Sequence, residues 1–170
     1  NLSISICIPV FYGEKTIKNL VLEVKKKLCN YRLEIVLVND GSKDNTKNTC
    51  IDLSNKYEFV KFINLRKNFG EHNAVLCGLN YVTGDYVVII DDDFQNPPSE
   101  IKKLIDRALE FDYDVVYSKY VEKKHHWARN LGSKFNDKVS TWLLNKPTGL
   151  YLSSFKLIKR EVGQEIIKYR

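Results

Sequence analysis

The sequence has no methionine, no long apolar run, no repeat and no low-complexity tract. Its longest apolar stretch, YVVII, is far too short to cross a bilayer, and we find no signal peptide. The four cysteines form no C-x-x-C pair and no Cys/His spacing typical of zinc, so we expect buried, reduced thiols without disulfides. They are Cys7, Cys29, Cys50 and Cys77. These absences argue against a membrane-spanning, disulfide-rich or repeat-built chain.

The composition is that of a globular domain, with 44% hydrophobic and 28% charged residues over 170 positions. We expect a single domain, taken from a longer chain because the sequence lacks methionine and begins inside a predicted strand. The net formal charge is −2 over residues 1–118 and +8 over residues 119–170. The basic C-terminal third suits a surface that meets phosphate groups, although a well-solvated face would have the same composition.

Strand and helix patterns alternate along the first two thirds of the chain. Runs rich in β-branched residues predict strands at 3–10, 33–39, 59–65, 85–90 and 113–119. Amphipathic spacing predicts helices at 14–28, 45–57, 71–82 and 98–111. Five strands alternating with four helices predict an α/β fold of three layers, α/β/α, with a mostly parallel sheet.

Polar clusters follow three of the predicted strands, and the most acidic is DDDFQNPP, residues 91–98. In an open α/β sheet, ligands bind beyond the carboxyl ends of the strands, where these clusters fall. Asp91 and Asp93 are two residues apart and can face the same way, while Asp92 points elsewhere. Two converging carboxylates, with the amide oxygen of Gln95, suit Mg²⁺ or Mn²⁺ completed by water and substrate phosphate.

Three alternatives to a metal site account less well for the acidic cluster. A helix N-cap needs fewer acids, because Pro97, Pro98 and Ser99 already start the next helix. An EF-hand loop would need glutamate at its twelfth position, where Lys102 stands. A phosphatase nucleophile motif would need a small hydroxyl residue in place of Gln95. We therefore predict a divalent metal site.

A second cluster, VNDGSKDNT at residues 38–46, follows the second predicted strand. Asp-Gly-Ser followed by Asp-Asn-Thr is common in strand-turn-helix connections, so the motif alone is weak. Beside an acidic metal site, Asp40 becomes a candidate acceptor for the N–H edge of a nucleobase.

Five segments, taken together, resemble the inverting family 2 nucleotide-sugar glycosyltransferases of the GT-A fold in order and spacing. They are ISICIPVFYGEKTI, LVNDGSKDNT, LRKNFGEHNAVLCGL, TGDYVVIIDDDFQNPP and YLSSFKLIKREV. The sequence is most similar to the branch that includes dolichol-phosphate mannose synthases and bacterial polyprenyl-phosphate glycosyltransferases. The resemblance implies a Rossmann-like, nucleotide-binding catalytic domain over residues 1–170. Its donor-binding part would span about 1–118, and its basic, acceptor-side part about 119–170.

The resemblance also implies roles for single residues. Asp93 and Arg129 would act in catalysis, and Asp93 would share the Mg²⁺ or Mn²⁺ ion with Asp91 and Gln95. The residues implied to bind the donor are Pro9, Phe11, Glu14, Val38, Asp40, Arg66, Asp92 and Lys134.

Two departures from the family pattern concern the nucleotide. The chain has FYGE at residues 11–14 where the family usually has YNEE, and Asn39 replaces the first acid of the usual DDGS. The missing side chain at Gly13 points to a different nucleotide or to a shifted role for Glu14.

The implied reaction is transfer of a sugar from a UDP- or GDP-type donor, with the metal neutralising charge on the leaving diphosphate. A hydroxyl acceptor needs a carboxylate base, yet no Asp or Glu lies between Asp137 and Glu161. A phosphate monoester has a second pKa of about 6, is largely dianionic near neutral pH and needs no base. We therefore expect a polyprenyl (lipid) phosphate acceptor. A glycan hydroxyl acceptor, or an inactive nucleotide-sugar-binding module, is the alternative.

An amphipathic pattern in the basic third also fits a lipid acceptor. Such a helix can lie at a membrane interface or pack on the sheet, and we expect peripheral contact at the inner, cytoplasmic face of a membrane. Metal binding by the adjacent His125 and His126 is not expected, because their side chains diverge. Nucleic acid is not expected as a partner, because the strongest cluster is acidic. The apolar positions of the pattern are Trp127, Leu131, Phe135, Val139, Trp142 and Leu143.

Overall fold

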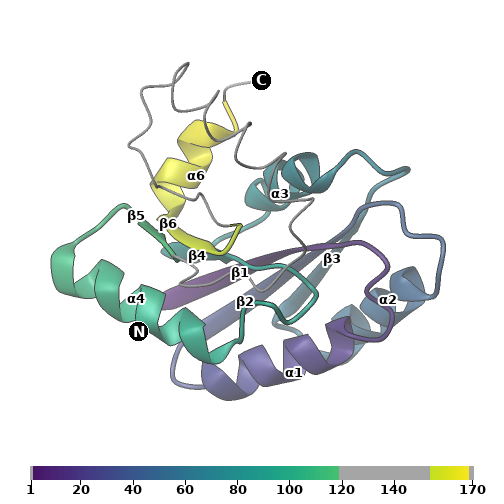
Figure 1. Cartoon of the computed structure of the whole chain (residues 1–170), viewed down its shortest axis with the longest axis horizontal. Helices are drawn as coiled ribbons and strands as arrows, with labels where there is room; N and C mark the ends of the chain where they lie inside the picture. The colour runs from purple at the N-terminus through teal and green to yellow at the C-terminus, as the bar shows by residue number, and fades with distance from the viewer. Residues whose placement is uncertain (1, 119–153, 169–170) are drawn as a thin grey trace, which may run out of the picture. The chain divides into compact units, whose positions relative to one another are not determined.

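The computed structural model describes residues 2–118 and 154–168 of the chain. In this part of the chain, a six-stranded sheet is covered by helices on both faces (Figure 1). The predicted three-layer α/β/α fold is therefore confirmed. The described residues up to Val116 and from Ser154 onward belong to one compact unit.

The strands combine parallel and antiparallel pairing. They are β1 (Ser3–Val10), β2 (Arg32–Asn39), β3 (Val60–Asn64), β4 (Tyr86–Ile89), β5 (Val115–Tyr117) and β6 (Lys156–Lys159). Their order in the sheet is β3-β2-β1-β4-β6-β5. β1 pairs in parallel with β2 and β4, and β2 pairs in parallel with β3. The carboxyl ends of β1, β2 and β4 therefore lie at one edge of the sheet.

The sixth strand, β6, is an addition to the five strands that the sequence predicted. It runs antiparallel to β4, with Lys156 opposite Ile89. Its four residues, KLIK, include only two apolar side chains, which is too short a pattern to assign a strand from sequence. Because the pairing is antiparallel, β6 begins at the edge where β4 ends.

Two groups of helices cover the sheet, one group on each face (Figure 1). α1 (Ile17–Lys27), α2 (Thr46–Lys56) and α4 (Ser99–Phe111) cover one face, and α3 (Glu71–Leu79) and α6 (Arg160–Ile166) cover the other. Side chains alternate along β4, so that Val88 and Ile90 pack on the α1 side, and Val87 and Ile89 pack on the α3 side. This alternation also sets the directions of the residues that follow the strand.

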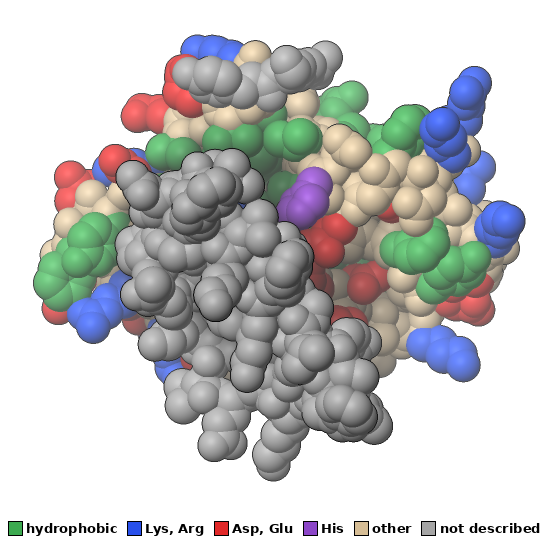
Figure 2. Space-filling view, turned by 45° about the horizontal axis from the view of Figure 1, so that its top comes forward, with side chains coloured by type: hydrophobic (Ala, Val, Ile, Leu, Met, Phe, Trp, Pro, Cys, Tyr) green, Lys and Arg blue, Asp and Glu red, His purple; other side chains and the backbone are tan. Residues whose placement is uncertain are grey.

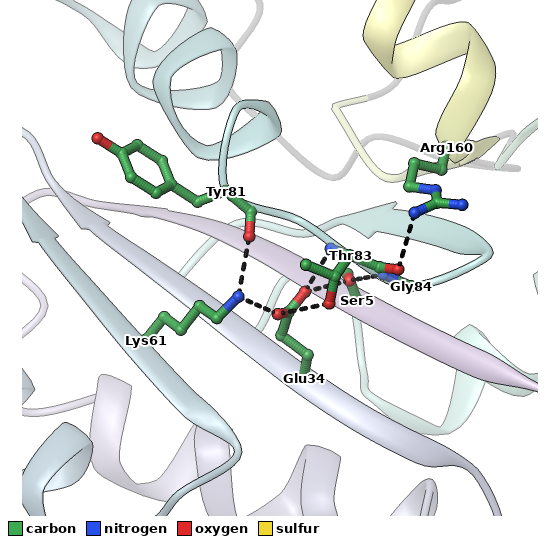
Figure 3. Close-up of polar contacts among 7 residues, drawn as sticks. All are labelled: Ser5, Glu34, Lys61, Tyr81, Thr83, Gly84 and Arg160. Carbon is green, nitrogen blue, oxygen red and sulfur yellow. Dashed lines mark hydrogen bonds and ion pairs between the residues drawn. The ribbon is translucent and has the colours of Figure 1, made fainter.

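A polar network closes the opposite, amino-terminal edge of the sheet (Figure 3). The Glu34 carboxylate on β2 pairs with Lys61 of β3 and accepts hydrogen bonds from Ser5 of β1 and from Thr83. Lys61 also donates to the carbonyl oxygen of Tyr81 at 3.1 Å. The network therefore joins three strands to the loop that precedes β4.

Within residues 2–118 and 154–168, no helix combines the length and the apolar character needed to cross a membrane. The amphipathic segment from Trp127 to Leu143 lies outside the described residues. All four cysteines are free thiols, as expected, although Cys29 is exposed and only Cys7 and Cys50 are buried.

Candidate functional site

The carboxyl ends of β1, β2 and β4 carry the three polar clusters predicted from the sequence. The segments that follow are residues 11–16, 40–45 and 91–98. β6 adds its first residues at the same edge, because it pairs antiparallel with β4. The site is therefore built from four segments that are distant in sequence.

Asp91 lies at this edge against the beginning of β6. Its Oδ2 atom accepts a hydrogen bond from the Ser154 hydroxyl. Burial raises the pKa of Asp91, and the negative charge of Asp93 raises it further, while Ser154 and Lys156 act in the opposite direction. A half-buried carboxylate beside a second carboxylate favours a neighbouring cation.

Asp92 turns away from Asp91, toward the loop after β1. Its Oδ2 atom accepts a hydrogen bond from the Phe11 backbone N–H at 3.1 Å. Burial, together with the charges of Asp93 and Asp91, raises the pKa of Asp92 to about 6 despite this hydrogen bond. Asp92 therefore fixes the position of the Phe11 backbone beside the acidic site.

Asp93 and Gln95 form a local pair. Asp93 accepts hydrogen bonds from the Gln95 backbone N–H at 3.0 Å and from the Gln95 side-chain amide at 2.7 Å. Both residues are exposed, and Phe94 between them has a positive φ of 61°. This turn holds the Asp93 carboxylate and the Gln95 amide on the solvent side of the site.

The oxygen atoms of the acidic site fit a divalent cation that is also bound by a substrate. Asp91, Asp93 and Gln95 offer the hard oxygen ligands that Mg²⁺ and Mn²⁺ prefer. No group of three His, Cys, Asp or Glu side chains in the described part of the chain is arranged to hold a metal by itself. Mg²⁺ commonly uses one or two carboxylates together with substrate phosphates and water, so two aspartates suffice.

Asp40 holds two loops together. It is 3% exposed, and its two carboxylate oxygens accept hydrogen bonds from the backbone N–H groups of Phe69, at 2.7 Å, and Gly70, at 2.9 Å. Gly41 lies directly against the backbone of Lys67 and Asn68. We call this contact between residues 40–41 and 67–70 the loop clasp. Two of the acceptor positions of Asp40 are thus occupied by backbone, and contact with a nucleobase stays a prediction.

A chain of hydrogen bonds links the loops after β1 and β2. The Tyr12 backbone N–H donates to Ser42 Oγ at 3.0 Å, and Ser42 Oγ donates to Asn39 Oδ1 at 2.6 Å. The Asn39 side-chain amide donates in turn to Asn64 Oδ1 at 2.8 Å. Asn39 is 1% exposed. An aspartate could not donate this last bond, so asparagine at position 39 is matched to Asn64.

The remaining predicted donor-binding residues take several positions. Phe11 is 46% exposed. Pro9 and Val38 are buried, so their side chains belong to the core beneath the site and not to its surface. Glu14 accepts a hydrogen bond from the Asn45 backbone N–H, at the start of α2. Arg66 is exposed in the loop between β3 and α3. Arg129 and Lys134 lie outside the described residues.

The family model for glycosyl transferase family 2 matches residues 5–166, nearly the whole chain. The chain belongs to glycosyl transferase family 2. The resemblance inferred from the sequence is confirmed at this level, while the narrower branch of dolichol-phosphate mannose synthases stays a prediction.

Solved structures share the fold of this family 2 chain. Glucosyl-3-phosphoglycerate synthase from Mycobacterium tuberculosis, in complex with Mn²⁺, UDP and phosphoglyceric acid, has a TM-score of 0.71 at 21% identity, covering 95% of this chain and 57% of that chain. The same synthase with Mn²⁺, UDP-glucose and phosphoglyceric acid has a TM-score of 0.73 at 21% identity, covering 95% and 58%. A structure described as a mycobacterial protein has a TM-score of 0.72 at 20% identity, covering 95% and 54%. Our chain thus spans less than two thirds of the length of each.

Glu71 and His72, the first two residues of α3, lie near the family 2 site and were not predicted from the sequence. Partial burial and the charges of Asp91 and Asp93 raise the pKa of Glu71, the first residue of α3, while His72 and Lys156 oppose the rise. Figure 2 shows acidic side chains gathered beside a histidine on this face. The signal in the sequence was only that Glu71 and His72 directly follow the RKNFG segment, residues 66–70.

Proposed function

We propose that the chain is the catalytic domain of a metal-dependent, inverting glycosyltransferase that uses a nucleoside-diphosphate sugar. The observation that carries the proposal is the acidic site of Asp91, Asp93 and Gln95 at the carboxyl end of β4, in a family 2 chain. Similar structures were solved in complex with Mn²⁺ and UDP or UDP-glucose, which supports this type of donor.

In this proposal, Asp91, Asp93 and Gln95 would hold Mg²⁺ or Mn²⁺ together with the donor. A divalent ion there supplies positive charge to the leaving nucleoside diphosphate. The residues of the chain orient the donor: Asp92 and Ser42 fix the loop after β1, and the loop clasp fixes the segment before α3. Basic residues of the C-terminal third, with Arg129 and Lys134 as candidates, would bind phosphate groups.

For the acceptor, we propose a phosphate monoester carried by a polyprenyl lipid. The reason is the absence of Asp and Glu between Asp137 and Glu161, since a phosphate dianion attacks without a general base. Phosphoglyceric acid, which is present in two of the similar structures, also carries a phosphate group. A lipid acceptor would bring the domain to the cytoplasmic face of a membrane.

A second candidate is transfer to a hydroxyl group of a glycan. Glu71 favours it, because partial burial and the nearby charges of Asp91 and Asp93 raise the pKa of this carboxylate. A carboxylate with a raised pKa near the site is the group that a hydroxyl acceptor needs. The two candidates therefore differ in whether Glu71 is required.

Radiolabelled UDP-glucose and GDP-mannose, each with Mn²⁺, would be offered to the chain with undecaprenyl phosphate, 3-phosphoglycerate or a glucan oligosaccharide. We expect metal-dependent transfer to the lipid phosphate, unchanged in Glu71→Gln. Transfer only to the oligosaccharide, lost in Glu71→Gln, would establish the hydroxyl candidate. Tight nucleotide binding with no transfer to any acceptor would indicate an inactive binding module.

The metal site is tested by Asp93→Asn, with Asp106→Asn on the exposed side of α4 as the matched control. Isothermal titration should show that Mn²⁺ strengthens UDP or GDP binding in the wild type and in Asp106→Asn. We expect Asp93→Asn to lose this gain, by tenfold or more, because a charged ligand is worth more than about 1.4 kcal/mol. Metal-independent nucleotide binding in all three proteins would refute the metal assignment.

A further inference from the structure

Tyr12 has a backbone conformation that bulky residues rarely adopt. Its φ is 57°, in the left-handed region, where Asn and Gly are found more readily. Its side chain is 53% exposed, at the carboxyl end of β1. Strain of this kind persists only where the surroundings impose it, and it is concentrated at functional sites.

Two hydrogen bonds fix the backbone that leads into Tyr12. The preceding amide, Phe11 N–H, is held by Asp92, and the Tyr12 N–H is held by Ser42. Ser42 is itself anchored by the buried Asn39. The loop therefore holds the Tyr12 ring in solvent at the cost of strain, although burial of the ring would be the usual gain from a tyrosine.

The Tyr12 ring keeps an open aromatic surface. It meets the Phe11 ring edge to face, with the centroids 4.6 Å apart and the planes at 71°. Such a pair covers only one of the four ring faces, and Phe11 is itself 46% exposed. The two rings thus form an exposed aromatic corner that can accept a flat, unsaturated group.

The position of the aromatic corner determines which part of the donor can contact it. In the sheet, β1 lies between β2 and β4. The Tyr12 backbone N–H donates a hydrogen bond to Ser42 in the loop after β2. Asp91 and Asp93 follow β4, on the other side of β1. A nucleoside diphosphate has its base at one end and its phosphates at the other. With the diphosphate at the aspartates, the base would extend toward β2 and Tyr12.

We infer that the Tyr12 ring stacks on the nucleobase of the donor and strengthens the binding of the nucleotide. This inference rests on the proposed function, because it takes the ligand to be a nucleoside diphosphate. Base–aromatic stacking is worth enough to change binding at least about fivefold. The resembling family usually has asparagine at this position, so an aromatic contact from Tyr12 would be a departure from the family pattern.

Binding of UDP, GDP and inorganic pyrophosphate, each with Mn²⁺, would be measured for the wild type, Tyr12→Asn and Tyr12→Phe. Tyr81→Ala is the matched control, because that tyrosine is 51% exposed and follows α3. We expect Tyr12→Asn to bind UDP or GDP at least about fivefold more weakly and pyrophosphate within twofold of the wild type. Tyr12→Phe and Tyr81→Ala should keep wild-type affinity.

Asparagine tolerates the left-handed conformation, so Tyr12→Asn should also unfold at the same or a higher temperature than the wild type. This readout separates lost stacking from lost folding. Nucleotide binding by the wild type with unchanged binding by Tyr12→Asn, or an equal loss of pyrophosphate binding, would overturn the inference alone. A wild type that binds neither nucleotide would overturn the proposed function together with it.

Discussion

At the scale of single residues, the alternation of β4 separates the consecutive aspartates. Ile89 packs on the α3 side and Ile90 on the α1 side, so Asp91 and Asp92 leave the strand toward opposite faces. Asp92 reaches the loop after β1, where a Cβ atom at Gly13 would lie 2.6 Å from its Oδ2. The resembling family usually has glutamate at position 13. Glycine at this position leaves the space that the Asp92 carboxylate occupies.

Gly13→Ala should destabilise the fold by about 1–3 kcal/mol, because the new methyl group must displace Asp92 or the buried Val10. Urea unfolding followed by circular dichroism measures the change. Gly163→Ala is the control, since its Cβ would come no nearer than 3.4 Å to Ile158 and alanine is favoured inside a helix. Equal stability of the two variants would contradict this placement of Asp92.

The opposite directions of Asp91 and Asp92 could be predicted from the sequence, because alternation is a local property of a strand. The partners of Asp40 could not be predicted in this way. They are backbone amides of Phe69 and Gly70, which are 29 and 30 residues away. Any of several loops could have met Asp40, and only the packed fold decides which one does.

At the scale of elements, the loop clasp joins the segments after β2 and before α3. Asp40 supplies the two hydrogen bonds, and Gly41, with φ of 71°, allows the backbones to touch. A Cβ atom at Gly41 would lie 2.5 Å from the Asn68 nitrogen and from the Lys67 carbonyl carbon. The clasp therefore sets where α3 begins, and with it the position of Glu71.

Gly41→Ala should cost about 2–4 kcal/mol, because backbone strain and an overlap with backbone atoms add together. Gly70→Ala is a matched comparison: its φ is 91°, but no atom lies within 4 Å of the added Cβ. This variant has the strain without the overlap, so it should lose about 1–3 kcal/mol less stability than Gly41→Ala. Chemical denaturation of both variants gives the difference. A Gly41→Ala protein that is as stable as Gly70→Ala would show that the two loops are not in contact.

The order of elements in the first two thirds of the chain was predictable, since each strand and helix carries its own pattern. The place of β6 was not. Its residues follow α4 and β5 in the chain, yet β6 lies between β4 and β5 in the sheet. Insertion beside β4 brings Ser154 to Asp91 and Lys156 close to the acidic site. Such long-range pairing has no counterpart in local periodicity.

At the scale of the whole described unit, the carboxyl and amino edges of the sheet differ in how their charged groups are paired. The carboxyl edge gathers acids that repel one another, and the pKa values of Asp91 and Asp92 are raised there. The amino edge is closed by the satisfied network of Glu34 (Figure 3). Burial raises the pKa of Glu34, but the hydrogen bonds from Lys61, Ser5 and Thr83 outweigh it and leave the pKa lowered. The amino edge therefore contributes stability that the site does not.

Glu34→Gln should lower the free energy of unfolding at pH 7 by about 1–3 kcal/mol, because it removes a charged hydrogen-bond acceptor that is only 14% exposed. The sign of the pH dependence follows from the lowered pKa. Near pH 4 the native state binds fewer protons at Glu34 than the unfolded chain does, so stability rises with pH. The advantage of the wild type should be complete above the ordinary value of 4.5 and should disappear as the pH falls through the native pKa.

Urea unfolding of the wild type and Glu34→Gln between pH 7 and pH 3 measures this difference. Glu110→Gln is the control: Glu110 also pairs with a basic residue, Arg107, but its side chain is 62% exposed. Exposed pairs of this kind contribute less than about 1 kcal/mol, so the control should differ little from the wild type at any pH. A Glu34→Gln deficit that stays constant from pH 7 to pH 3 would mean that the charge of Glu34 does not stabilise the amino edge. The loss would then come from packing alone.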